Sequence, residues 1–128
     1  MRFLIHGAIH ADAQKALLKH EHHCHTLPAD TDAAVAEAPA ELCKLLAKQQ
    51  WNLLTTDSDF VARLYEEHVN FAGVIVLLLD DPAVLNDQPA AIDRLFERYH
   101  RLSSWRLYTV TASRVKIRQL PGANAKLS

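Results

Sequence analysis

NLLTTDSDFVARLYEEHVNFAGVIVLLL, residues 52–79, is the stretch that decides the fold. It begins with a short apolar segment that ends at Thr55, continues through a helical pattern over 60–67, and closes with an unbroken hydrophobic run over 71–79. A continuous run of that kind is typical of a strand covered on both faces, as in a parallel sheet. The stretch therefore predicts a strand, a helix and a second, buried strand.

Alternating strands and helices extend outward from this stretch on both sides. The last two segments alternate apolar and polar residues, and 112–114 can turn them into an antiparallel hairpin. We therefore expect one domain, residues 1–128, folded as a three-layer α/β/α sandwich with a mainly parallel sheet and a C-terminal β-hairpin. The further strands are predicted over 2–5, 23–27, 106–111 and 115–120, and the further helices over 12–22, 41–50 and 89–100, with a short helix within 29–38.

The length and the cysteine content suit a single compact domain in a reducing compartment. The chain has 128 residues, and the spacing of its two cysteines, Cys24 and Cys43, suggests neither a metal site nor a disulfide framework. The longest apolar run, over 74–79, is too short to span a bilayer, and Met1 leads into a strand without a signal-peptide pattern. We expect a cytoplasmic protein with no membrane partner.

The formal net charge of −1 conceals an uneven distribution of charge. Residues 1–92 hold 6 Lys and Arg against 13 Asp and Glu, whereas residues 93–128 hold 8 against 2. One interpretation is a phosphate-binding edge, because the arginine fork matches phosphate geometry. The other is a solvated helix face and an edge hairpin whose charges discourage aggregation.

Two carboxylates, Asp57 and Asp59, come directly after the first strand of the opening stretch, with one residue between them. In a parallel α/β sheet the ligand sites gather at the carboxyl ends of the strands. Two acids so close repel each other, and Mg²⁺ or Mn²⁺ is a common means of keeping both ionised. The alternative is that Asp57 caps the following helix and Asp59 complements its dipole.

The order of the motifs resembles the PIN-like nuclease superfamily, and most closely its short, mostly uncharacterised prokaryotic group associated with toxin-antitoxin pairs. The resemblance covers nearly the whole chain. Its most specific element is Thr-x-Asp-x-Asp-Phe, here Thr55, Asp57, Asp59 and Phe60, followed by the strand residues 73–75. The segments that carry it are MRFLI, HHCHTL, WNLLTTDSDF, FAGVIVLLL and TASRVKIRQLP.

The resemblance implies a metal-dependent ribonuclease, in which a cluster of acids holds Mg²⁺ or Mn²⁺ and the cation activates a water. Asp57 and Asp59 match the later acids of that cluster, as metal ligands and catalytic residues. His6 stands where the family places its first aspartate, and it would favour Mn²⁺ or Zn²⁺ over Mg²⁺. Glu41 is the nearest substitute for the second acid, and Thr55 or Thr56 is placed to support the loop by hydrogen bonding.

The alternative is a catalytically impaired PIN-like domain that acts as a protein- or RNA-binding module, since His6 removes one negative charge from the cluster. In either case Arg114, Lys116 and Arg118 are the candidate RNA-binding residues. The resemblance also implies a small antitoxin-like protein partner, and a homodimer as in many relatives.

Five of the eight histidines are His10, His20, His22, His23 and His25. Together with Cys24 they could supply Zn²⁺ ligands. However, His23 and His25 face one side of an extended strand and Cys24 the other, so the run does not converge on one ion without help from elsewhere. The alternative is a polar helix end that leads into an edge strand.

Overall fold

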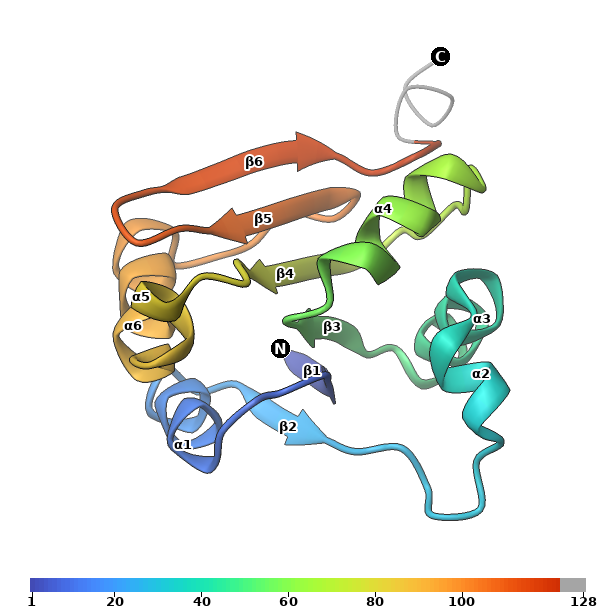
Figure 1. Ribbon diagram of the computed structural model, residues 1–128, viewed down its shortest axis with the longest axis horizontal. Helices are drawn as coiled ribbons and strands as arrows, with labels where there is room; N and C mark the ends of the chain where they lie inside the picture. Colours follow the sequence, from blue (N-terminus) through green and yellow to red (C-terminus); the bar gives the residue numbers. More distant parts are fainter. Residues whose placement is uncertain (123–128) are drawn as a thin grey trace.

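The computed structural model describes residues 1–122, which form a six-stranded sheet with helices on both faces (Figure 1). The strand order is β2-β1-β3-β4-β5-β6; the first five strands are parallel, and β6 runs antiparallel to β5. The predicted α/β class, the mainly parallel sheet and the C-terminal hairpin are confirmed. The strands are β1 (Arg2–His6), β2 (His23–His25), β3 (Asn52–Thr55), β4 (Val74–Leu78), β5 (Arg106–Val110) and β6 (Val115–Gln119).

The helices form the two outer layers, with α1, α5 and α6 on one face of the sheet and α2, α3 and α4 on the other (Figure 1). Each of α3 and α6 has 11 residues, whereas a bilayer span needs about 20 apolar residues. No helix within residues 1–122 is long and apolar enough to cross a membrane. The helices are α1 (Ala11–Lys19), α2 (Ala33–Glu37), α3 (Pro39–Gln49), α4 (Ser58–Glu66), α5 (Pro82–Leu85) and α6 (Gln88–Arg98).

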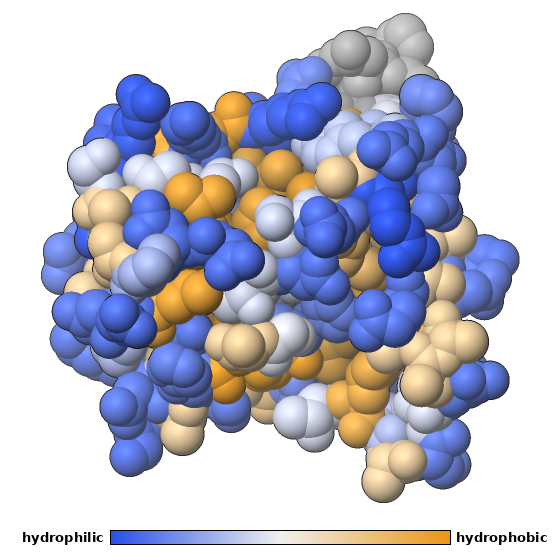
Figure 2. Space-filling model, viewed as in Figure 1, coloured by the Kyte–Doolittle hydropathy of each residue, from blue (hydrophilic) through white to orange (hydrophobic). Residues whose placement is uncertain are grey.

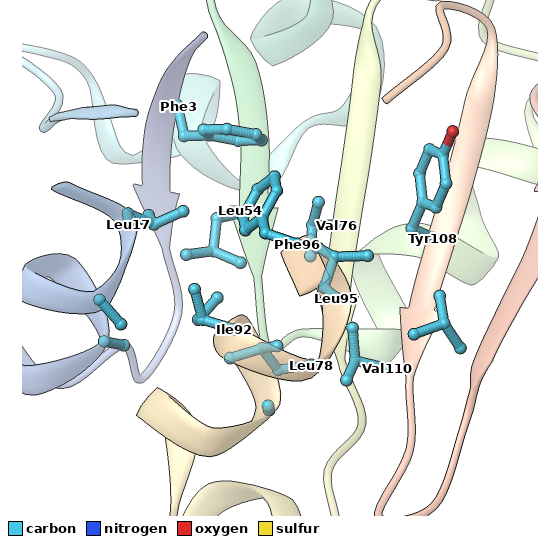
Figure 3. Packing of buried hydrophobic residues seen from close by; sticks show 14 of the residues in the cluster. Phe3, Leu17, Leu54, Val76, Leu78, Ile92, Leu95, Phe96, Tyr108 and Val110 are labelled. Atoms are coloured by element: carbon cyan, nitrogen blue, oxygen red, sulfur yellow. The ribbon is translucent and has the colours of Figure 1, made fainter. Parts of the chain in front are cut away.

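Alternate residues of the central strands supply two separate hydrophobic cores. In β4 all five residues are buried, because Val76 and its alternates pack toward α1 and α6 while Ile75 and Leu77 pack toward α3 and α4. Figure 3 shows the first of these cores, in which Phe96 of α6 lies against side chains of the sheet. The apolar run of the opening stretch is therefore explained by helices on both faces.

The chain reverses direction across the sheet between β1 and β3. It leaves β1 for β2 on one side, and then returns past β1 to form β3 on the other side. Ligands of open α/β sheets bind outside the carboxyl ends of the strands at such a reversal. Here those ends are His6 and Thr55, which are paired in register.

Several element boundaries differ from the prediction. The short helix α5 was not predicted, because only four residues after the capping Asp81 are helical and they carry no full helical period. The buried strand begins at Val74 instead of residue 71, because the side chain of Asn52 accepts the hydrogen bond of the Val74 amide and the preceding residues lie outside the ladder. The second strand ends at His25, where its pairing with β1 ends.

Candidate functional site

His6 and Thr55 form the centre of the site at the carboxyl ends of β1 and β3. His6 is 8% exposed and Thr55 is fully buried. His6 Nδ1 lies 2.8 Å from Thr55 Oγ1, and His6 Nε2 lies 3.2 Å from the carbonyl oxygen of Ala36 in α2. The imidazole also packs against the ring of Phe60, with centroids 4.7 Å apart. His6 therefore joins two strands and two helices.

The directions of these hydrogen bonds can be assigned from their partners. A carbonyl oxygen only accepts, so His6 Nε2 donates to Ala36, and in the uncharged ring Nδ1 then accepts from the hydroxyl of Thr55. Thr55 Oγ1 in turn accepts the amide of Asp57 at 2.9 Å. Both ring nitrogens are thus engaged, and a cation could be bound by His6 only at the expense of one of these bonds.

The loop from β1 to α1 is pinned from two sides. Gly7 has φ +80°, and a Cβ atom there would lie 2.6 Å from Thr56 Oγ1, which accepts the amide of Ala8 at 2.9 Å. Gln88, buried at the start of α6, donates to the carbonyl of Ala8 at 2.8 Å and accepts the amide of His10 at 2.7 Å. The expectation that Thr55 or Thr56 supports a loop by hydrogen bonding is confirmed for both.

Asp57 and Asp59 lie at the beginning of α4. Asp57 is the N-cap residue, and its Oδ1 accepts the amide of Phe60 at 3.0 Å. Asp59 lies in the first helical turn with an exposed side chain, where it complements the helix dipole. The helix-capping interpretation of the two acids is confirmed.

Helix capping also accounts for three further aspartates among the first 92 residues. Asp32, Asp81 and Asp87 each accept an amide in the first turn of α2, α5 and α6 respectively. Each such cap typically contributes about 1 kcal/mol to the free energy of unfolding. These aspartates, like Asp57, thus accept hydrogen bonds from the amides that begin the helices.

Glu41 lies in the first turn of α3 and points to solvent. Its side chain is 57% exposed, and its carboxylate lies 3.6 Å from the ammonium of Lys44, three residues on in the same helix. Among residues 1–122, no three His, Cys, Asp or Glu side chains are grouped so that they could hold one metal ion. In this arrangement Asp57, Asp59, Glu41 and His6 do not present a common set of ligands to one cation.

The candidate RNA-binding residues lie on the edge hairpin and are exposed. Arg114 is in the turn between β5 and β6, where Thr111 Oγ1 accepts its amide and donates to its carbonyl. Lys116 and Arg118 are alternate residues of β6, paired with Thr109 and Leu107, so their side chains share one face. This face is the one that α4 partly covers, since the Arg118 guanidinium carbon lies 3.8 Å from the ring centroid of Tyr65.

The histidine-rich segment 20–25 follows α1 and forms the edge strand β2. The interpretation as a polar helix end that leads into an edge strand is therefore confirmed. His20 Nε2 lies 2.8 Å from Asp93 Oδ1, and His25 stacks on the ring of Trp51. His22 Nδ1 lies 2.9 Å from the N-terminal ammonium, and burial followed by that positive charge lowers the pKa of His22 to about 4. These histidines therefore have separate structural partners.

Comparison of the chain with known protein families, with curated proteins and with solved structures finds no match in any of the three. Gln88, which holds the loop after β1 at the site, gives no signal in the sequence, because a glutamine at the start of a helix resembles a surface residue. Its role depends on the packing of α6 against the loop after β1, about eighty positions away in the chain.

Proposed function

We propose that this chain is a PIN-like domain that binds RNA without cation-dependent cleavage. The observation that carries the proposal is the double hydrogen bonding of His6, whose two ring nitrogens are used by Thr55 and Ala36. The resemblance in the sequence puts an acidic cation ligand at this position. Here the position is His6, whose side chain links the ends of β1 and β3 to α2.

The exposed basic side chains of β6 and its turn supply the binding surface in this proposal. Arg114, Lys116 and Arg118 lie along one edge of the sheet, where phosphates of a single strand can approach them. The arginine side chains offer paired donors that match phosphate oxygens. Affinity from such contacts is expected to fall steeply with added salt.

A metal-dependent ribonuclease is the second candidate function. It is favoured by the position of Asp57 and Asp59, which follow the strand at the reversal of the sheet, where α/β proteins bind their ligands. Asp57 Oδ1 accepts the amide of Phe60, so for this function the cation would bind the second carboxylate oxygen, Oδ2. The small antitoxin-like partner and the homodimer implied by the resemblance stay predictions; light scattering of the purified chain would give its oligomeric state.

The test combines binding and cleavage of one fluorescent single-stranded RNA. In the presence of a chelator we expect the RNA to bind, with an affinity that declines as salt is added, because the contacts are ionic. With Mn²⁺ or Mg²⁺ we expect no cleavage by the wild type or by Asp57→Asn, and the same RNA binding by both. Cleavage by the wild type that Asp57→Asn abolishes would establish the second candidate function instead.

A further inference from the structure

A groove of about 490 Å³ lies between α4 and the strands β5 and β6, away from the pair formed by His6 and Thr55. Its floor is apolar, because Leu77 and Leu107 contribute to it from the sheet and Val61 from the helix. Figure 2 shows apolar surface between the hydrophilic residues over β6 and those over α4. The remaining lining residues are Ser58, Ala62, Tyr65, Thr109, Lys116, Ile117 and Arg118.

The charged side chains that line the groove, within the described residues, are Lys116 and Arg118, both cations. The guanidinium carbon of Arg118 lies over the ring of Tyr65, 3.8 Å from its centroid. Tyr65 is itself held in position, because its hydroxyl donates to the carbonyl of Gln119 at 2.7 Å. The groove therefore has a positive rim whose planar cation is already held in position.

An apolar floor, a planar cation and a second positive charge match the parts of a nucleotide. A nucleobase can lie against apolar side chains or stack on an arginine plane, and a phosphate binds arginine and lysine at the rim. The hydroxyl of Thr109 is an additional hydrogen-bonding group in the lining. An acidic peptide would match the charge, but its carboxylates would leave the apolar floor without a partner.

We infer that this groove binds one nucleotide of a single-stranded RNA, with the base on the apolar floor and the phosphate at Lys116 and Arg118. The inference rests on the proposed RNA-binding function, and adds to it where and how one unit of the RNA is held. A nucleotide held in the groove differs from RNA bound to a general basic surface in one testable way. Filling the groove should weaken RNA binding even when every charged side chain is kept.

The first test uses AMP as the probe, with adenosine and inorganic phosphate as its two halves. In two-dimensional amide NMR spectra we expect AMP to shift signals of α4, β5 and β6. Phosphate alone should shift fewer of these signals, because it leaves the apolar floor empty. Shifts confined to other elements, or shifts from a glutamate-rich peptide with none from AMP, would overturn the inference.

The second test closes the groove without a change of charge. Ala62 is exposed on α4 and lines the groove, so Ala62→Phe should fill it, while Ala47→Phe makes the same change at an exposed position of α3. We expect Ala62→Phe to weaken AMP and RNA binding about tenfold, which is the size expected for the loss of one base contact. Ala47→Phe should bind as the wild type does.

The third test removes the cations. Arg118→Ala is compared with Arg98→Ala, because Arg98 is an exposed arginine on α6 that lies over the ring of Tyr99. Weaker AMP binding in Arg118→Ala but not in Arg98→Ala supports the inference. RNA binding that Arg118→Ala weakens but Ala62→Phe leaves unchanged overturns the inference and leaves the proposed function standing. RNA binding unchanged in both variants overturns the inference together with the role of Arg118 in the proposed surface. AMP binding without any RNA binding overturns the proposed function and leaves the groove as a nucleotide site.

Discussion

His6 and Thr55 lie opposite each other on β1 and β3, and their side chains are joined by a hydrogen bond of 2.8 Å. The same threonine accepts the amide of Asp57, and the same histidine donates to Ala36. Three segments far apart in the chain, β1, α2 and the end of β3, are therefore tied together at the reversal of the sheet. This network engages both ring nitrogens of His6, the atoms through which this side chain would bind a cation.

Thr55→Val should destabilise the fold by about 2 kcal/mol, because it keeps the shape of the side chain but removes the hydroxyl. His6 Nδ1 and the Asp57 amide would then lose their partner in a buried position. Urea denaturation measures the change. Thr56→Val is the matched control, since Thr56 Oγ1 has its Ala8 partner near the surface, where water can replace it. Equal losses in the two variants would contradict the importance of the buried network.

Gly7→Ala should lower the free energy of unfolding by at least about 2 kcal/mol, because alanine disfavours the left-handed backbone conformation at this position and its Cβ meets a steric conflict. The residue has φ +80°, and the new Cβ would lie 2.6 Å from Thr56 Oγ1. In a Thr56→Ala background the conflict is removed while the backbone strain stays, so the same glycine substitution should cost less. An equal cost in both backgrounds, measured by a double-mutant cycle, would rule out the contact.

The stability of the protein should fall as the pH drops from about 6.5 to about 4, because of His22. Burial and the N-terminal ammonium lower the pKa of His22 from 6.5 to about 4. In that window the unfolded chain binds a proton that the folded chain does not, so the free energy of unfolding decreases by up to about 3 kcal/mol.

Urea titrations of the wild type and His22→Phe at about pH 7 and about pH 4.5 check the contribution of His22. Phenylalanine keeps the packing against Phe96, whose ring centroid lies 4.3 Å from that of His22, but it takes up no proton. The variant should lose less stability than the wild type over this interval. The same loss in both proteins would show that other groups carry the pH dependence.

The fold class was predictable because apolar residues recur at different spacings in strands and in helices. The buried run that contains Val74 to Leu78 indicates a central parallel strand, and β4 occupies that place. The strand order was not predictable, because it depends on which strands pair across long connections. The helix α5 was missed because four residues are too short to show a helical period.

The site was only partly predictable. The position of Asp57 after a strand predicts either a helix cap or a metal ligand. The sequence does not distinguish the two, whereas the structure shows that the Asp57 carboxylate accepts the amide of Phe60. His6 stands out in the sequence as a departure from the expected acid, but its partners Thr55 and Ala36 are 49 and 30 positions away. Contacts over such separations leave no periodic signal in the residues near His6.

Calorimetric titration of Mn²⁺ into the wild type and into His6→Asp tests most directly whether His6 has taken the place of a cation ligand. We predict no Mn²⁺ binding by the wild type, because both ring nitrogens of His6 are already hydrogen-bonded. His6→Asp supplies a third carboxylate at the strand ends, and we predict measurable binding that Asp57→Asn then removes. Stoichiometric binding of Mn²⁺ by the wild type, lost in Asp57→Asn, would contradict the account.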